Sequence, residues 1–183
     1  MTSRKILFYL MSEKGLSVIK TLISNNLTQA IGKVVIGKDT NVINDFSQDI
    51  ENMCIENDIE FYYKNEKFSP LEEYSIAISW RWLIEESNSK LIVLHDSLLP
   101  KYRGFAPLVN ALLNNEPEIG VSAIFATKEF DKGDVITQSK TKVNYPIKIN
   151  DAIQLISQNY NKVIKVLVSK ILNEEPLIGI KQK

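Results

Sequence analysis

The sequence has few of the residues that build cysteine-based or histidine-rich sites. It contains a single cysteine, Cys54, and a single histidine, His95. One cysteine excludes an intrachain disulfide and a cysteine-rich metal cluster, so no metal is expected. This scarcity of cysteine is typical of a protein that works in a reducing compartment.

The chain also lacks net charge and long apolar runs. Acidic and basic residues number 22 each, so no overall field would attract nucleic acid or an anionic membrane, and neither is expected as a partner. No apolar run approaches the roughly 20 residues that span a bilayer. The short run Ile6 to Met11 stops at once at polar residues, which favours a first buried strand over a signal peptide. We therefore expect a soluble, cytoplasmic protein.

What the sequence does contain is an alternation of apolar runs and amphipathic segments. Apolar residues at helical spacing predict a helix after residue 15. The same spacing predicts three further helices, over 44–57, 105–114 and 149–172. Apolar runs predict strands at 6–11, 30–36, 59–63, 74–80, 90–94, 120–125 and 135–143. This order predicts one α/β domain over residues 1–183, with a Rossmann-like, mostly parallel sheet and helices on both faces. In such a sheet the ligand crevice lies at the carboxyl ends of the strands.

His95 lies just past the predicted strand at 90–94, where its side chain would point into that crevice. An imidazole there can accept a proton from an amine near neutral pH, although lone histidines are often structural. Asp131 lies in a D-x-G turn that leads into the next strand. If the two side chains were adjacent, the carboxylate could orient the imidazole and stabilise its protonated form. The alternative is that Asp131 only shapes its turn.

The motif HDSLLPKYRG at 95–104, Gly120-Val121-Ser122 and the Asp131-Lys132-Gly133 turn together resemble the folate-dependent formyltransferases. That family includes glycinamide ribonucleotide transformylase, methionyl-tRNA formyltransferase and the sugar N-formyltransferases. The resemblance covers about 50 residues closely. It implies formyl transfer to an amine, with His95 and Asp131 as the catalytic residues.

The resemblance also implies that N10-formyltetrahydrofolate is the formyl donor and binds along the segment after the fourth strand. In this chain the donor-binding residues would be Trp80, Arg81, Trp82, Leu83 and Ile84. The family holds the pterin largely through backbone hydrogen bonds. The two tryptophans could wall an apolar pocket, or they could simply pack in the core.

Two residues depart from the family pattern. Val93 stands where the family has its catalytic asparagine, and Asp96 stands where it usually has proline. Valine cannot donate a hydrogen bond to an oxyanion, and losing one such donor typically costs about 10²–10³ in rate. Either another side chain substitutes, or His95 acts alone, or the protein is a weak or inactive folate-binding homologue. The substitutes considered are Ser79, Asn110 and Ser122.

The acceptor is inferred by elimination. The purine-pathway enzyme has a phosphate-binding loop after its first strand. The corresponding loop here, residues 11–15, is poorly suited to bind a phosphate. The chain ends soon after its last helix, whereas methionyl-tRNA formyltransferase carries a further domain. A nucleotide-linked amino sugar, as used in polysaccharide biosynthesis, is therefore the leading acceptor, with the other two amines as alternatives. The residues expected to contact it are Ser79, Asp96, Lys101, Tyr102 and Arg103. A homodimer and a missing C-terminal tail are left open.

Overall fold

The computed structural model describes residues 5–84 and 90–183; residues 1–4 and 85–89 lie outside the described part. A seven-stranded sheet has the order β3-β2-β1-β4-β5-β6-β7. The first five of these strands pair in parallel, and the β5–β6 and β6–β7 pairs are antiparallel. The strands are β1 (Ile6–Leu10), β2 (Ile31–Ile36), β3 (Phe61–Tyr63), β4 (Tyr74–Ile78), β5 (Lys90–His95), β6 (Glu118–Phe125) and β7 (Val135–Lys142). The predicted mostly parallel α/β sheet is confirmed.

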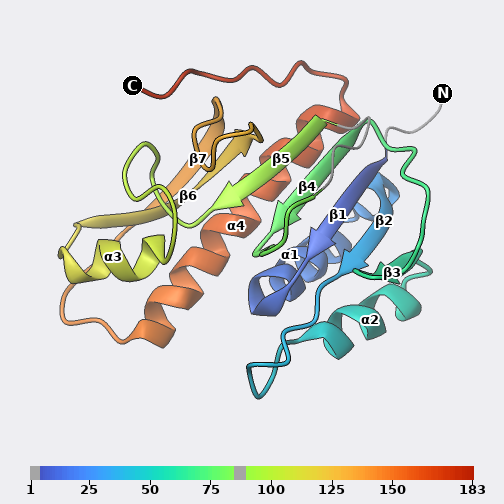
Figure 1. Cartoon of the computed structure of the whole chain (residues 1–183), viewed down its shortest axis with the longest axis horizontal. Coiled ribbons are helices and arrows are strands. Elements are labelled where there is room, and N and C mark those ends of the chain that lie inside the picture. The colour runs from blue at the N-terminus through green and yellow to red at the C-terminus, as the bar shows by residue number, and fades with distance from the viewer. Residues whose placement is uncertain (1–4, 85–89) are drawn as a thin grey trace.

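The described residues also form four α-helices and one short 3₁₀ helix (Figure 1). The α-helices are α1 (Ser12–Ser24), α2 (Ser47–Glu56), α3 (Pro107–Leu113) and α4 (Ile149–Leu172), and the 3₁₀ helix is η1 (Thr28–Ala30). Helix α4 is amphipathic, and its buried stripe includes Ile156, Tyr160 and Val163. It packs on α1 and on the last two strands, which ties the two halves of the sheet together.

At three positions an element begins later or ends earlier than its sequence pattern predicts because the backbone there is left-handed. The strand predicted to reach residue 80 ends at Ile78, because Ser79 has φ 54°. Phe46 (φ 60°) and Ala106 (φ 50°) delay the starts of α2 and α3 in the same way. A positive φ interrupts both the strand and the helix hydrogen-bond pattern, and an apolar pattern does not report it.

The two faces of the sheet are covered differently. All four α-helices contribute side chains to the main apolar core, for example Leu16, Ile50, Leu108 and Ile156. A second, smaller cluster on the other face of the central strands combines strand residues with loop residues, and no helical residue belongs to it. Its members are Leu7, Tyr9, Phe68, Val35, Ala77, Trp80, Ile84, Leu91 and Val93. The described helices therefore pack mainly against one face, as the view in Figure 1 also suggests.

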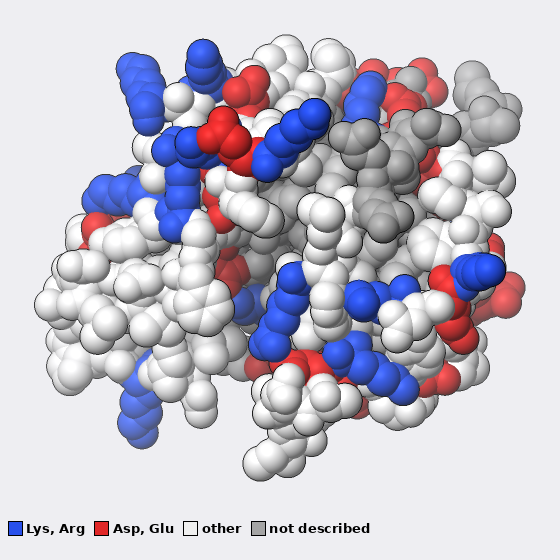
Figure 2. All heavy atoms as spheres, in the orientation of Figure 1, with Lys and Arg blue, Asp and Glu red and all other residues white. Residues whose placement is uncertain are grey.

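Charged side chains of both signs are interspersed over the face shown in Figure 2. No single-sign field covers that face, in keeping with the equal numbers of acidic and basic residues. Within residues 5–84 and 90–183, none of the helices combines the length and apolar character needed to cross a membrane.

Candidate active site

His95 is the last residue of β5 and is 8% exposed. Its Nε2 lies 2.8 Å from the backbone oxygen of Tyr102, and its Nδ1 lies 3.5 Å from Oδ1 of Asp131. A carbonyl oxygen can only accept, so the contact with Tyr102 requires a proton on Nε2. The lone pair of the neutral ring is then on Nδ1, beside the carboxylate.

Asp131 is fixed from a second direction. Its Oδ2 accepts a hydrogen bond from the backbone N–H of Gly104 at 2.9 Å, and its own backbone has φ 55° in the turn before β7. The loop that contains Tyr102 and Gly104 thus touches both His95 and Asp131. The structure therefore brings together the two residues that the sequence left 36 positions apart.

The side chains considered as substitutes for the missing asparagine are already engaged. The Ser122 hydroxyl donates to the backbone oxygen of Ser97 at 2.5 Å. Nδ2 of Asn110 donates to the backbone oxygen of Ala106 at 3.0 Å and contacts that of Phe105 at 3.2 Å. The Ser79 side chain interacts with the Tyr160 hydroxyl, which itself donates to Leu94 and Asp96. Val93 itself packs among apolar side chains of the smaller cluster.

Asp96 belongs to a polar network on the helical side of the sheet. Its carboxylate pairs with the Lys14 ammonium of α1 and accepts a hydrogen bond from the Tyr160 hydroxyl of α4. Burial, followed by the charge of Asp96, raises the pKa of Tyr160 well above its ordinary value. Sequence reasoning missed Lys14 because it placed residues 11–15 in a loop, whereas α1 begins at Ser12, and it missed Tyr160 because that residue looked like an ordinary member of an amphipathic helix. The predicted acceptor contact Asp96 is thus part of an internal network in the structure.

The basic loop after β5 divides into two parts. Lys101 Nζ contacts both carboxylate oxygens of Glu116, at 2.9 and 3.0 Å, and the Tyr102 hydroxyl donates to the same carboxylate at 2.8 Å. These bonds lower the pKa of Glu116 and raise that of Tyr102. Arg103 instead donates to the Gln182 side chain. The loop is therefore braced rather than freely solvated.

The segment predicted to hold the donor leaves β4 at the same edge as His95, since Ile78 pairs with Leu94. Trp80 packs edge-on against Tyr9 and Trp82, with ring centroids 5.1 Å apart in both pairs. The rest of the predicted segment varies in exposure: Arg81 pairs with Asp39, Ile84 is half-buried, and Leu83 is 83% exposed. The tryptophans are packed together as a wall rather than spread along an open surface.

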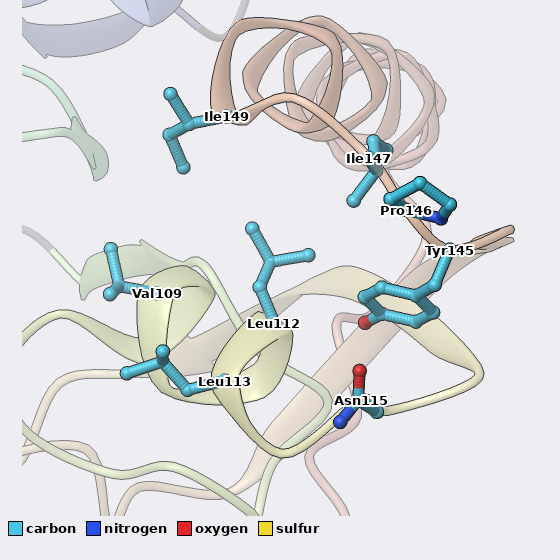
Figure 3. Close-up of a pocket in the computed structure, with 8 residues that line it drawn as sticks. All are labelled: Val109, Leu112, Leu113, Asn115, Tyr145, Pro146, Ile147 and Ile149. Carbon is cyan, nitrogen blue, oxygen red and sulfur yellow. The ribbon is translucent and has the colours of Figure 1, made fainter.

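A mostly apolar pocket lies elsewhere, between α3 and the chain leading into α4 (Figure 3). Its volume is about 650 Å³, and its lining is mostly apolar, with Leu112 and Ile149 facing each other across the gap. The lining residues are Val109, Leu112, Leu113, Asn115, Tyr145, Pro146, Ile147 and Ile149. None of the predicted site residues is among them, so we place the chemistry at His95 and not in this pocket.

Comparison with known proteins supports the same region. The family model described as "Formyl transferase" matches residues 71–169, more than half of the chain. A methionyl-tRNA formyltransferase of Mycoplasmopsis pulmonis is 38% identical over 82 residues, which cover 45% of this chain and 28% of the relative.

Solved structures match the fold over nearly the whole chain at low identity. An N-formyltransferase from Helicobacter canadensis, in complex with folinic acid and dTDP-3-aminofucose, superposes with a TM-score of 0.79 at 20% identity and covers 98% of this chain and 67% of that one. A glycinamide ribonucleotide transformylase from Symbiobacterium toebii gives a TM-score of 0.75 at 12% identity and covers 100% and 96%. The chain spans less than half the length of the curated relatives it matches.

Proposed function

The chain belongs to the formyl transferase family, and from this premise we propose that it moves a formyl group from N10-formyltetrahydrofolate to the amine of a nucleotide-linked amino sugar. Residues 1–183 would form one catalytic domain. We propose that it works in the cytoplasm, because a chain with a single cysteine suits a reducing compartment. The observation that carries the proposal is the contact of His95 with Asp131 at the carboxyl end of β5.

We assign a different role to each nitrogen of His95. The Tyr102 carbonyl holds the proton on Nε2, so Nδ1 is the atom that takes a proton from the attacking amine. The imidazolium formed in this way has its new charge beside the Asp131 carboxylate, at 3.5 Å. The Gly104 N–H keeps that carboxylate oriented while the proton is held. This division of roles explains why the loop at 102–104 touches both residues.

The donor supplies the formyl carbon, and the segment 80–84 fits a flat, partly apolar ligand. The Trp80 and Trp82 rings pack together as a wall, and the exposed Leu83 offers an apolar contact beside them. Arg81 pairs with Asp39 through Nη1 and remains 60% exposed, so it can also face a carboxylate of a folate. These residues would bind and orient the donor next to His95.

A second candidate function is folate binding with weak or absent catalysis. It is favoured by Val93 in its apolar surroundings and by the engagement of Ser79, Asn110 and Ser122 with other groups. An oxyanion at this edge would then rely on His95 alone. The two candidates share the donor site and differ only in turnover.

The amino-sugar acceptor is favoured over methionyl-tRNA by charge. Net charge is zero, and charges of both signs alternate over the face in Figure 2, whereas a tRNA ligand calls for a basic surface. Arg103 is the cation of the loop that we assign to a diphosphate, because Lys101 is already paired with Glu116. Methionyl-tRNA remains the alternative acceptor, since the curated relatives named above act in that reaction.

The test is a formyl-transfer assay with N10-formyltetrahydrofolate and three acceptors: a dTDP-linked amino sugar, glycinamide ribonucleotide and methionyl-tRNA. We expect multiple turnovers with the amino sugar only. Calorimetry with folinic acid measures donor binding separately. Donor binding without turnover on any acceptor would support the second candidate, and the absence of any folate affinity would contradict both.

Variants then test the mechanism. His95→Ala and Asp131→Asn should each lower kcat by about 10²- to 10⁴-fold, because they remove the proton acceptor and its orienting charge. Asp134→Asn is the matched control, since Asp134 is an exposed aspartate of the same turn and should keep full activity. Unchanged turnover in both site variants would refute the assigned roles.

A further inference from the structure

The segment after α4 returns to the sheet and lies along the turn that contains Asp131. Ile180 pairs with Val135 through two backbone hydrogen bonds of 2.8 Å, just where β7 begins. At Gly179 a Cβ atom would lie 2.6 Å from Cβ of Asp134 and 3.1 Å from the Phe125 ring. The approach is therefore too close for any larger residue at position 179. Residues 179–182 are held against the turn by backbone as well as by side chain.

The Gln182 carboxamide uses all of its hydrogen-bonding capacity in this position. Its Nε2 donates to the backbone oxygens of Asp131 and Gly133, at 2.8 and 2.7 Å. Its Oε1 accepts from Nε and Nη2 of Arg103, at 2.9 and 2.7 Å. Two donors and two acceptor positions are thus all filled by two different loops.

These two loops are the ones that contact His95. Asp131 faces Nδ1, and the neighbour of Arg103, Tyr102, holds Nε2 through its backbone oxygen. The direct link between the loops is one hydrogen bond, from Gly104 to Asp131. Gln182 adds a second link between the loops, made of the four hydrogen bonds of its side chain. A shift of either loop would change the Asp131–His95 distance.

We propose that Gln182 is a positioning residue for the transfer reaction: its carboxamide clamps the Asp131 turn to the Arg103 loop and so sets the distance between Asp131 and His95. This inference rests on the proposed function for its kinetic consequence, but its structural part can be measured without turnover.

An amide suits this position better than a carboxylate for two reasons. Glutamate has no N–H to donate to the two carbonyl oxygens of the turn. Glutamate would also form an ion pair with Arg103, whereas the neutral amide leaves the guanidinium charge available to an anionic acceptor. Gln182→Glu therefore separates the two halves of the clamp, because it keeps the bonds to Arg103 and loses those to the turn.

The experiment uses the full chain and the fact that His95 is its only histidine. The imidazole ¹⁵N and ¹³C signals belong to that residue alone and report its tautomer and hydrogen bonds. Spectra of Gln182→Ala, Gln182→Glu and Gly179→Val are compared with wild type and with Asp131→Asn. Lys181→Ala and Lys183→Ala are matched controls, since both lysines are exposed neighbours of Gln182. A thermal melt confirms that each variant is folded.

We expect the three test variants to move the His95 signals in the same direction as Asp131→Asn, while both lysine controls match wild type. Because a displacement of about 1 Å can cost 10²-fold, kcat should fall by about 10- to 100-fold in Gln182→Ala with the donor KM unchanged. Gln182→Glu should in addition raise the acceptor KM, because the new carboxylate pairs with the Arg103 guanidinium and neutralises its charge toward an anionic acceptor.

Wild-type His95 signals in folded Gln182→Ala would overturn the inference, and so would an equal effect of the lysine controls. Shifted His95 signals in a protein that formylates no acceptor would instead leave the clamp in place and contradict the proposed function. The two failures are therefore distinguishable.

Discussion

At the scale of single residues, the site depends on how His95 is held from both sides. Its two nitrogens face a backbone carbonyl and a carboxylate, so its tautomer and orientation are set before any ligand arrives. Two residues along the same strand, Val93 offers only apolar surface to its neighbours. The two side chains that we propose move the proton are thus in contact, whereas Val93 offers no hydrogen-bond donor at the position that the family resemblance assigns to the oxyanion.

The first prediction restores that donor. Val93→Asn should raise kcat, by up to about 10²- to 10³-fold, because the amide can donate to the developing oxyanion. Steady-state kinetics with the amino sugar measure the gain. Val93→Leu, which adds bulk without a donor, should not exceed wild type. A folded Val93→Asn variant with no gain would show that the oxyanion does not form near this position.

At the scale of elements, the carboxyl ends of β2, β4 and β5 bring the tryptophans of the proposed donor site to the same edge of the sheet as His95. The end of β2 matters because Gly37 lies under both tryptophans. A Cβ there would lie 2.7 Å from Cζ3 of Trp82 and 3.0 Å from Cζ3 of Trp80. The orientation of the wall therefore depends on the lack of a side chain in a neighbouring strand.

The second prediction tests that dependence. Gly37→Ala should push the two rings outward, cost about 1–3 kcal/mol of stability and weaken folinic acid binding about tenfold. Calorimetry gives the affinity, and urea unfolding gives the stability. Gly32→Ala is the control, because its Cβ would also meet a side chain, that of Glu72, but at the other end of β2 from the tryptophans. Equal affinities for the two variants would argue against a donor site at the tryptophans.

At the scale of the whole molecule, one large core joins all four α-helices to the sheet and a small loop-covered cluster lies on the other face. The large core buries groups that ionise only at high pH. Burial raises the pKa of the Cys54 thiol from its ordinary 9.0 to about 12. Unfolding exposes this thiol, so above pH 9 the unfolded chain loses a proton that the folded chain keeps.

The third prediction follows from that difference. The free energy of unfolding should fall as pH rises from 9 to 12, with Cys54 contributing up to about 1.4 kcal/mol per pH unit. Urea unfolding of wild type and Cys54→Ala at several pH values isolates the contribution. Cys54→Ala should be less stable at neutral pH and lose less stability on going to alkaline pH. Parallel pH curves would contradict the assigned role of the thiol.

Local pattern was enough to predict most of the fold, and the family resemblance pointed to His95 and Asp131 as candidate catalytic residues. Apolar periodicity located the seven strands and the long α4, because burial of one face repeats at short sequence intervals. His95 and Asp131 could be proposed because each follows or precedes a strand in a recognisable motif. The pattern could not predict that elements end or begin at Ser79, Phe46 and Ala106, because a left-handed backbone does not change the spacing of apolar residues.

Only the tertiary structure decided which polar groups meet. Asp96 contacts Tyr160 across 64 positions and Arg103 contacts Gln182 across 79, and no local rule relates residues so far apart. The chain folds these segments together because the sheet and α4 bury their apolar faces, and the polar groups left at the edge then pair with one another. The sequence by itself therefore determined the strands and marked His95 and Asp131 as candidates, and the packing decided that the two side chains meet and how they are held.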